Sequence, residues 1–167
     1  CISGTHGKTT TTSMCTHIFM AAEADPTVMI GGTLPLLHSG YRVGNGDTII
    51  LESCEYCNSF LNFFPTVAVI LNVEEDHLDF FKDLADIEHS FHAFADLVPQ
   101  RGYIISNADD AGARDSVKGL QHPVFTFAVQ DRTADCVADN VSFFDGCPVF
   151  GVVIHGEVYA HVELKIP

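Results

Sequence analysis

Short, continuously apolar runs recur along the first 130 residues of this chain and predict strands. A run without polar alternation is typical of a strand whose two faces are both covered. The clearest example is TVAVILN, which is rich in β-branched residues. The predicted strands cover residues 27–30, which end at Gly31-Gly32, and residues 47–52, 66–72, 102–106 and 123–127.

Segments with helical periodicity lie between these runs. Residues 8–22 place Met14 and Ile18 at helical spacing, residues 86–97 are amphipathic and end before Pro99, and residues 109–118 open with two aspartates. Strands that alternate with helices predict a doubly wound α/β fold around a mostly parallel sheet.

The pattern changes from about residue 134 onward. Strand-like segments there are separated by Asp145-Gly146 and His155-Gly156, which are typical of hairpin turns. Residues 134–167 are therefore predicted to form mainly a small antiparallel β-sheet near the C-terminus.

The segment GTHGKTTTT, residues 4–12, follows a short strand and leads into the first predicted helix. Glycines allow close approach of the backbone, Lys8 offers a charge to the phosphates, and the hydroxyl of Thr9 suits Mg²⁺. The loop is shorter than the strict G-x-x-x-x-G-K-[ST] pattern. It predicts a phosphate-binding loop for ATP or GTP, with a plain helix-capping turn and Lys8 in solvent as the alternative.

Polar residues also stand where other predicted strands end. Glu52 ends one strand, Asn72 ends another, and Asn107 follows a third. His77 lies in the acidic run that follows Asn72. Parallel strands put their carboxyl ends at one edge of the sheet, so Glu52 and His77 are both expected near Thr9. Carboxylate oxygen suits Mg²⁺, whereas imidazole suits a second metal or a hydrogen bond. The alternatives are a solvated carboxylate for Glu52, a capping or core histidine for His77, and a helix cap for Asn107.

Composition narrows the possible partners. The chain has 167 residues and a formal net charge of −14, so binding to nucleic acid is not expected. No apolar run approaches the roughly 20 residues that span a bilayer, so no membrane partner is expected. Position 1 is not Met and falls within a strand, so we expect a piece of a longer protein.

The six cysteines predict neither a disulfide framework nor a complete zinc site. Cys54 and Cys57 have the spacing of half a zinc site, but no second pair follows. We expect reduced thiols in a cytoplasmic protein, and the roles of Cys54, Cys57, His89 and His92 stay open.

Taken together, the motifs resemble the Mur ligases, the ATP-dependent amide ligases of peptidoglycan biosynthesis. The resemblance rests on GTHGKTTTT at 4–12, ESCEYCNSFL at 52–61, LNVEEDHLDFF at 71–81 and SNADD at 106–110, in the family's order. It implies that residues 1–167 are the central ATP-binding domain of a three-domain enzyme. The N-terminal UDP-sugar domain and the C-terminal domain would lie outside this chain, and the isolated chain is expected to be inactive.

The resemblance also implies a chemistry. ATP would convert the carboxylate of UDP-N-acetylmuramate into an acyl phosphate, and the amine of L-alanine would then displace phosphate. Lys8 would stabilise the transferring phosphoryl group, and Thr9 and Glu52 would hold a first Mg²⁺. His77 would act at a second Mg²⁺, and Asn107 would contact adenine. The loop residues implied to surround the nucleotide are Gly4, Thr5, His6, Gly7, Lys8, Thr9 and Thr10.

One departure from the family pattern concerns a carbamylated lysine that many Mur ligases carry past the Asp-His motif. No lysine lies between Asp83 and Lys118 in this chain.

A related ligase that attaches a recycled peptide to the same sugar would share this ATP site. Two further classes of protein compete with a ligase: a generic phosphate-loop switch or kinase, and a metal-binding module built on the Cys and His residues. Amino-acid selectivity, oligomeric state and domain closure are not determined by the sequence.

Overall fold

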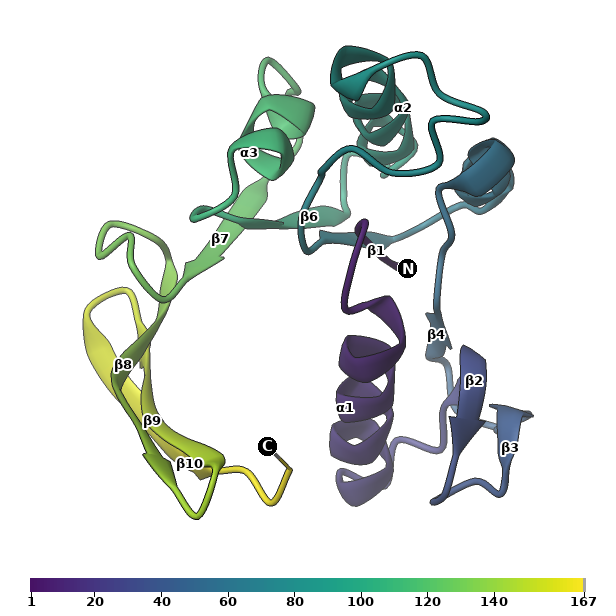
Figure 1. Ribbon diagram of the computed structural model, residues 1–167. Helices are drawn as coiled ribbons and strands as arrows, with labels where there is room; N and C mark the ends of the chain where they lie inside the picture. The colour runs from purple at the N-terminus through teal and green to yellow at the C-terminus, as the bar shows by residue number, and fades with distance from the viewer. Residues whose placement is uncertain (167) are drawn as a thin grey trace.

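The structure, a computed structural model, describes residues 1–166 and contains a sheet of seven strands in the order β1-β5-β6-β7-β8-β9-β10 (Figure 1). Neighbouring strands from β1 to β8 run parallel, and the last two pairs run antiparallel. The predicted mixed sheet is confirmed. The strands are β1 (Ile2–Ser3), β5 (Val67–Ile70), β6 (Tyr103–Asn107), β7 (Val124–Ala128), β8 (Cys136–Phe144), β9 (Cys147–Ile154) and β10 (Glu157–Glu163).

A second sheet of three strands, in the order β3-β2-β4, lies beside β1. It comprises β2 (Thr27–Leu34), β3 (Ser39–Arg42) and β4 (Ile49–Leu51). A parallel bridge between Ile2 and Glu52 joins the end of β4 to β1. The strand that leads into the glycine-rich loop therefore lies between the ends of β4 and β5, which carry the polar residues singled out in the sequence.

The expectation that the strand at 27–30 ends at Gly31 was wrong, because β2 continues through both glycines to Leu34. The neighbouring strand β3 was not predicted. At Gly40 of β3, an added Cβ would lie 2.7 Å from the carbonyl oxygen of Gly32. The strands thus approach closely where side chains are missing, and the glycines permit this pairing instead of breaking the strand.

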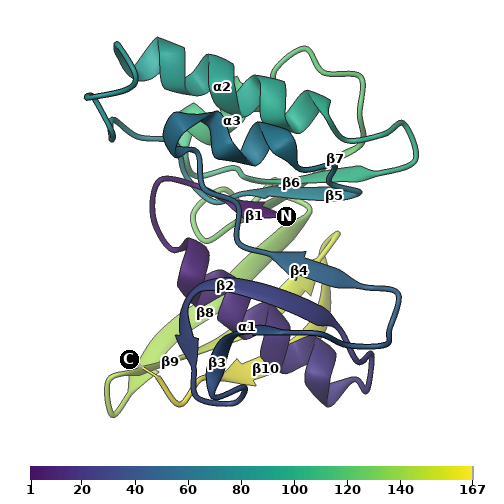
Figure 2. The same ribbon diagram turned by 90° about the vertical axis from the view of Figure 1, so that its right-hand side faces the viewer.

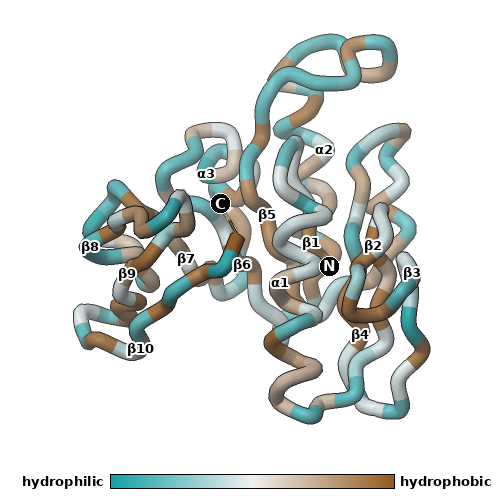
Figure 3. Tube along the Cα trace, turned by 60° about the horizontal axis from the view of Figure 1, so that its bottom comes forward, coloured by the Kyte–Doolittle hydropathy of each residue, from teal (hydrophilic) through white to brown (hydrophobic). Residues whose placement is uncertain are grey.

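Helices cover both faces of the parallel strands, as a doubly wound fold requires (Figures 1 and 2). Helices α2 (Leu84–Asp96) and α3 (Ala111–Val117) lie on one face, and α1 (Lys8–Ala21) lies on the other. In Figure 3 the hydrophobic colour runs along β5, which lies between β1 and β6. The largest fully buried side chains of the core around β5, β6 and α2 are Phe60, Ile70, Ile87, Phe91, Phe94 and Ile104.

Helix α1 has the predicted position but a different buried face. Its fully buried residues are Thr12 and Thr16, while Ile18 is 65% exposed. The Thr12 hydroxyl donates to the carbonyl of Lys8 (2.8 Å), and the Thr16 hydroxyl donates to that of Thr12 (2.8 Å). These bonds within the helix satisfy the buried hydroxyls, so a threonine face can pack without a polar partner elsewhere.

The C-terminal strands form the expected antiparallel hairpins, with turns at residues 145–146 and 155–156. They also continue the main sheet, since Phe127 and Ala128 of β7 pair with Cys136 and Val137 of β8.

Asp110 caps α3 and also ties that helix to the segment after β5. One carboxylate oxygen accepts from the backbone N–H of Ala113 (2.7 Å) and from that of Val73 (3.1 Å). We expect Asp110→Ala to lower the free energy of unfolding by about 1–3 kcal/mol, because a cap and a second backbone donor lose their acceptor. Urea denaturation measures this loss. Asp115→Ala, on the exposed side of the same helix, is the matched control, and an equal effect of both variants would contradict the prediction.

Candidate nucleotide and metal site

The loop between β1 and α1 depends on two glycines. Gly7 precedes the helix with φ 81°, and Gly4 has φ 150°. A Cβ at Gly4 would lie 2.9 Å from the Cβ of Leu71, so only glycine fits there. The first backbone N–H groups of α1 have no acceptor within the helix, which makes its N-terminus suited to an anion.

Asn72, two residues after the end of β5, fixes the conformation of this loop. Its side chain accepts from the His6 N–H (2.7 Å) and donates to the His6 carbonyl (3.1 Å), and its own carbonyl accepts from the Thr5 N–H (3.0 Å). The Thr5 hydroxyl is buried and accepts from the Glu74 N–H (2.9 Å). The Thr5 side chain thus holds the loop to the strand end, and nucleotide contacts of Thr5, His6 and Thr10 stay predictions.

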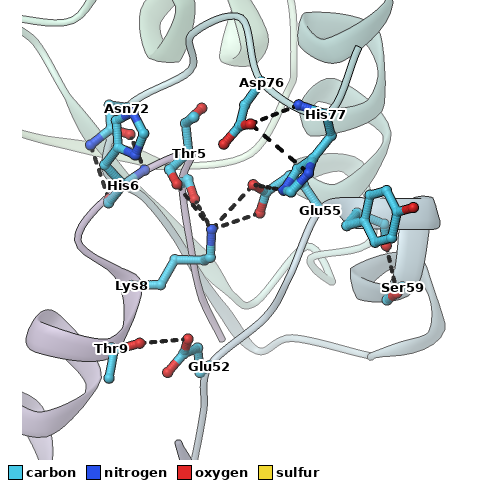
Figure 4. A network of polar contacts seen from close by, with 12 residues as sticks. Thr5, His6, Lys8, Thr9, Glu52, Glu55, Ser59, Asn72, Asp76 and His77 are labelled. Atoms are coloured by element: carbon cyan, nitrogen blue, oxygen red, sulfur yellow. Dashed lines mark hydrogen bonds and ion pairs between the residues drawn. The ribbon is translucent and has the colours of Figure 1, made fainter. Parts of the chain in front are cut away.

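Lys8 turns back into the loop and pairs with Glu55 (Figure 4). Its ammonium donates to the carbonyls of Gly4 (2.6 Å) and Thr5 (3.1 Å) and to both oxygens of Glu55 (2.9 and 3.1 Å). The Lys8 side chain is 14% exposed and that of Glu55 only 2%. The alternative with Lys8 in solvent was therefore wrong, because a buried carboxylate and two carbonyls hold the ammonium inside.

Thr9 and Glu52 meet at the other side of Lys8, as Figure 4 shows. The Thr9 hydroxyl donates to one oxygen of Glu52 (2.8 Å), and the other oxygen accepts from the Gly31 N–H (2.7 Å). Two oxygen atoms that can act as metal ligands, one from α1 and one from the end of β4, thus lie in contact at the first turn of α1. The interpretation of Glu52 as an isolated, solvated carboxylate does not agree with these contacts.

His77 lies in the segment between β5 and α2, and its imidazole ring is close to two carboxylates. Its Nε2 is 3.7 Å from Glu55, and its Nδ1 is 3.9 Å from Asp76. One ligand atom from each of Glu55, Asp76 and His77 lies within 4.8 Å of the other two. The Tyr56 ring lies against the imidazole with 4.7 Å between ring centroids.

The importance of Glu55 was missed in the sequence. It precedes a turn in which Cys57 (φ 53°) and Asn58 (φ 55°) are left-handed, a conformation that apolar periodicity does not predict. The only available signal was a second acid three residues after the strand-end Glu52.

The chemistry of these donors fits a divalent cation at both places. Thr9 and Glu52 offer only oxygen, which Mg²⁺ prefers. Glu55, Asp76 and His77 offer two carboxylates and an imidazole, a set that divalent metals accept. The binding of a metal by Thr9, Glu52 and His77 remains a prediction.

Asn107 lies at the end of β6, next to a cavity of about 200 Å³. Its amide donates to the Leu71 carbonyl (3.0 Å) and accepts from the Asp109 N–H (3.0 Å). The cap of α3 is Asp110, so the helix-cap interpretation of Asn107 was wrong. The cavity walls are mainly apolar and include Phe127, Val129, Cys136, Val137 and Phe150.

Asp109 orders the segment that borders this cavity. Burial alone would raise the pKa of its carboxyl, but the backbone N–H groups of Gln130, Val129 and Asp131 outweigh burial and lower it. The carboxylate thus stays charged and fixes the chain that follows β7.

The cysteines, His89 and His92 do not belong to either of these two clusters. All six cysteines are free thiols, and Cys54 and Cys57 are exposed. His92 makes a 2.9 Å contact between its Nδ1 and the Ser116 carbonyl, whereas His89 lines a separate cavity beside Phe81. Within residues 1–166, no helix combines the length and apolar character needed to cross a membrane.

The strand, glycine-rich loop and helix, with carboxylates at adjacent strand ends, define an α/β domain of the phosphate-loop class. Residues 2–167 match the Mur ligase middle domain, and the chain belongs to this family.

The curated relatives of this chain include two ligases from Clostridium species. The chain is 43% identical over 167 residues to the UDP-N-acetylmuramate–L-alanine ligase of Clostridium perfringens. It is 45% identical over 166 residues to the enzyme of that name from Clostridium novyi. Each match covers 99% of this chain but only 36% of the relative, so the chain spans about a third of their length.

Solved structures with the same fold include two at 26–27% identity. The UDP-N-acetylmuramate:L-alanyl-γ-D-glutamyl-meso-diaminopimelate ligase of Neisseria meningitides has a TM-score of 0.86 at 27% identity, over 99% of this chain and 55% of that one. The UDP-N-acetylmuramate–alanine ligase of Thermotoga maritima has a TM-score of 0.82 at 26% identity, over 99% and 36%. The MurF ligase of Thermotoga maritima, solved in complex with ADP, shares the fold at 18% identity with a TM-score of 0.74 over 97% of this chain and 39% of that one.

Proposed function

We propose that residues 1–167 form the central ATP-binding domain of a ligase that joins L-alanine to UDP-N-acetylmuramate, with ATP converted to ADP and phosphate. The names of the curated relatives and their 43–45% identity support this substrate pair. The observation that carries the proposal is the placement of Lys8 and Thr9, adjacent in one loop, against two separate carboxylates, Glu55 and Glu52. Domains for the UDP-sugar and for the amino acid would lie before and after this segment.

In this proposal the chain's own groups position and neutralise the triphosphate. The N–H groups at the start of α1 would receive phosphate oxygens, and Lys8 would exchange its contact with Glu55 for the β- and γ-phosphates. Thr9 and Glu52 would hold one Mg²⁺, and Glu55, Asp76 and His77 a second. Bound Mg²⁺ supplies positive charge that stabilises the developing charge of phosphoryl transfer.

The adenine would occupy the apolar cavity beside Asn107. The amide of Asn107 already makes one hydrogen bond at each end, but its oxygen has a second lone pair and its nitrogen a second N–H. These free positions suit a base edge, while walls such as Phe127 and Val137 suit its faces.

The test is ADP release by the full-length protein with ATP, Mg²⁺ and UDP-N-acetylmuramate. We expect release that depends on L-alanine and yields the amide product by mass spectrometry. The isolated chain is expected to give no amide. ADP release that is independent of both amino acid and sugar would contradict the proposal and would favour a generic phosphate-loop enzyme.

A second candidate is a ligase that attaches a recycled peptide to the same sugar. The TM-score of 0.86 to the Neisseria peptide ligase favours it, whereas the higher identity to the L-alanine ligases favours the first candidate. Replacing L-alanine in the assay with the tripeptide L-alanyl-γ-D-glutamyl-meso-diaminopimelate distinguishes the two.

A further inference from the structure

The Glu52 carboxylate lies directly on the backbone of Gly31, a contact that the nucleotide-binding motif does not explain. The Gly31 N–H donates to one carboxylate oxygen at 2.7 Å, and the Thr9 hydroxyl donates to the other. A Cβ built on Gly31 would lie 2.6 Å from Oε1 of Glu52, 3.0 Å from Cδ and 3.2 Å from Oε2. Any side chain at position 31 would thus occupy the space that the carboxylate now fills.

The backbone gives no other reason for glycine here. Gly31 lies in the middle of β2, and its φ is outside the left-handed range that L-residues avoid. In this respect it differs from Gly7, whose φ of 81° is itself a reason for glycine. An alanine at position 31 would therefore meet the Glu52 carboxylate without straining the backbone.

We propose that Gly31 is a positioning residue for the cation site at Thr9. Its bare α-carbon gives Glu52 room, and its N–H fixes one carboxylate oxygen so that the other faces the Thr9 hydroxyl. This inference rests on the proposed function, in which Glu52 and Thr9 hold a divalent cation. Partners that orient a ligating carboxylate commonly change metal affinity 10–100-fold when they are altered.

The neighbouring residue provides a matched control. Gly32 lies in the same strand, and a Cβ there would be 3.5 Å from the Thr9 methyl carbon, an ordinary contact. Gly31→Ala and Gly32→Ala make the same chemical change one residue apart, but only the first displaces the Glu52 carboxylate.

The experiment measures Mn²⁺ binding to the full-length protein with ADP present, by electron paramagnetic resonance. We expect Gly31→Ala to weaken Mn²⁺ binding by about tenfold or more, and Gly32→Ala to change it by less than about twofold. Adding Glu52→Asp to Gly31→Ala withdraws the carboxylate by one methylene and is expected to recover part of the affinity. Equal melting temperatures of the two alanine variants confirm that the effect is local.

Glu52→Ala tests the metal role of Glu52 separately from the positioning role of Gly31. If Glu52→Ala leaves Mn²⁺ binding unchanged, the proposed metal role of Glu52 is wrong, and the proposed function loses this support. If Glu52→Ala weakens binding but Gly31→Ala does not, the carboxylate adapts to the added methyl group and only the inference about Gly31 is overturned.

Discussion

Lys8→Ala is expected to weaken binding of Mg·ATP to the full-length protein by about 100-fold or more. A hydrogen bond to a charged group contributes roughly 1.5–3 kcal/mol, and Lys8 is placed to reach two phosphates. Isothermal titration calorimetry with Mg·ATP measures the loss. Unchanged affinity would remove Lys8 from the phosphate site.

The same substitution is expected to destabilise the domain for a separate reason. Glu55 is 2% exposed, and Lys8 is the cation bonded to it. Removing one partner of a buried ion pair costs about 3–5 kcal/mol, because the remaining charge stays buried without compensation. Lys8→Ala alone therefore combines a loss of phosphate binding with a loss of folded protein.

A double variant resolves this ambiguity. Lys8→Ala combined with Glu55→Gln removes the uncompensated charge, so the melting temperature should recover most of its loss while Mg·ATP binding stays weak. Recovery of ATP binding together with stability would show that Lys8 acts on the fold and not on the nucleotide.

The fold was predictable where one physical signal dominated. The strands at 66–72, 102–106 and 123–127 were predicted because strands covered on both faces are continuously apolar, and β5, β6 and β7 lie there. The position of α1 was predicted too, but its buried face was not. Periodicity counts apolar residues, whereas α1 buries threonines whose hydroxyls bond to its own carbonyls.

The site was predictable only as far as strand ends define it. The rule that ligands lie at the carboxyl ends of parallel strands led to Glu52 and to the segment of His77, and the structure places both beside the loop. It could not lead to Glu55, whose carboxylate turns inward from an irregular turn with two left-handed residues. Nor could it lead to Gly31, because its role depends on the space that another side chain fills.

Glu55→Gln is expected to change metal and nucleotide binding in opposite directions. In the structure the carboxylate contacts both the Lys8 ammonium and the His77 imidazole. Its loss should weaken Mn²⁺ binding in the presence of ADP by about tenfold or more, because a carboxylate ligand of the proposed second cation becomes an amide. Turnover of the full-length enzyme should fall at least as far.

Nucleotide binding without metal should instead become tighter in Glu55→Gln. Two charges about 5 Å apart interact by roughly 3 kcal/mol at an effective dielectric constant near 20, so Glu55 both repels phosphate and competes for Lys8. Calorimetry with ATP and a chelator measures this change, for which we expect a gain of about tenfold or more.

Glu74→Gln is the control for this pair of measurements. Glu74 is 60% exposed and lies 3.8 Å from His6 at the same loop, so solvent screens its charge and both affinities should move little. If Glu55→Gln weakened the binding of metal-free ATP as well as Mn²⁺, the carboxylate would be a support of the loop. Opposite signs in Glu55→Gln alone would show that one carboxylate holds Lys8 before ATP arrives and serves the cation afterwards.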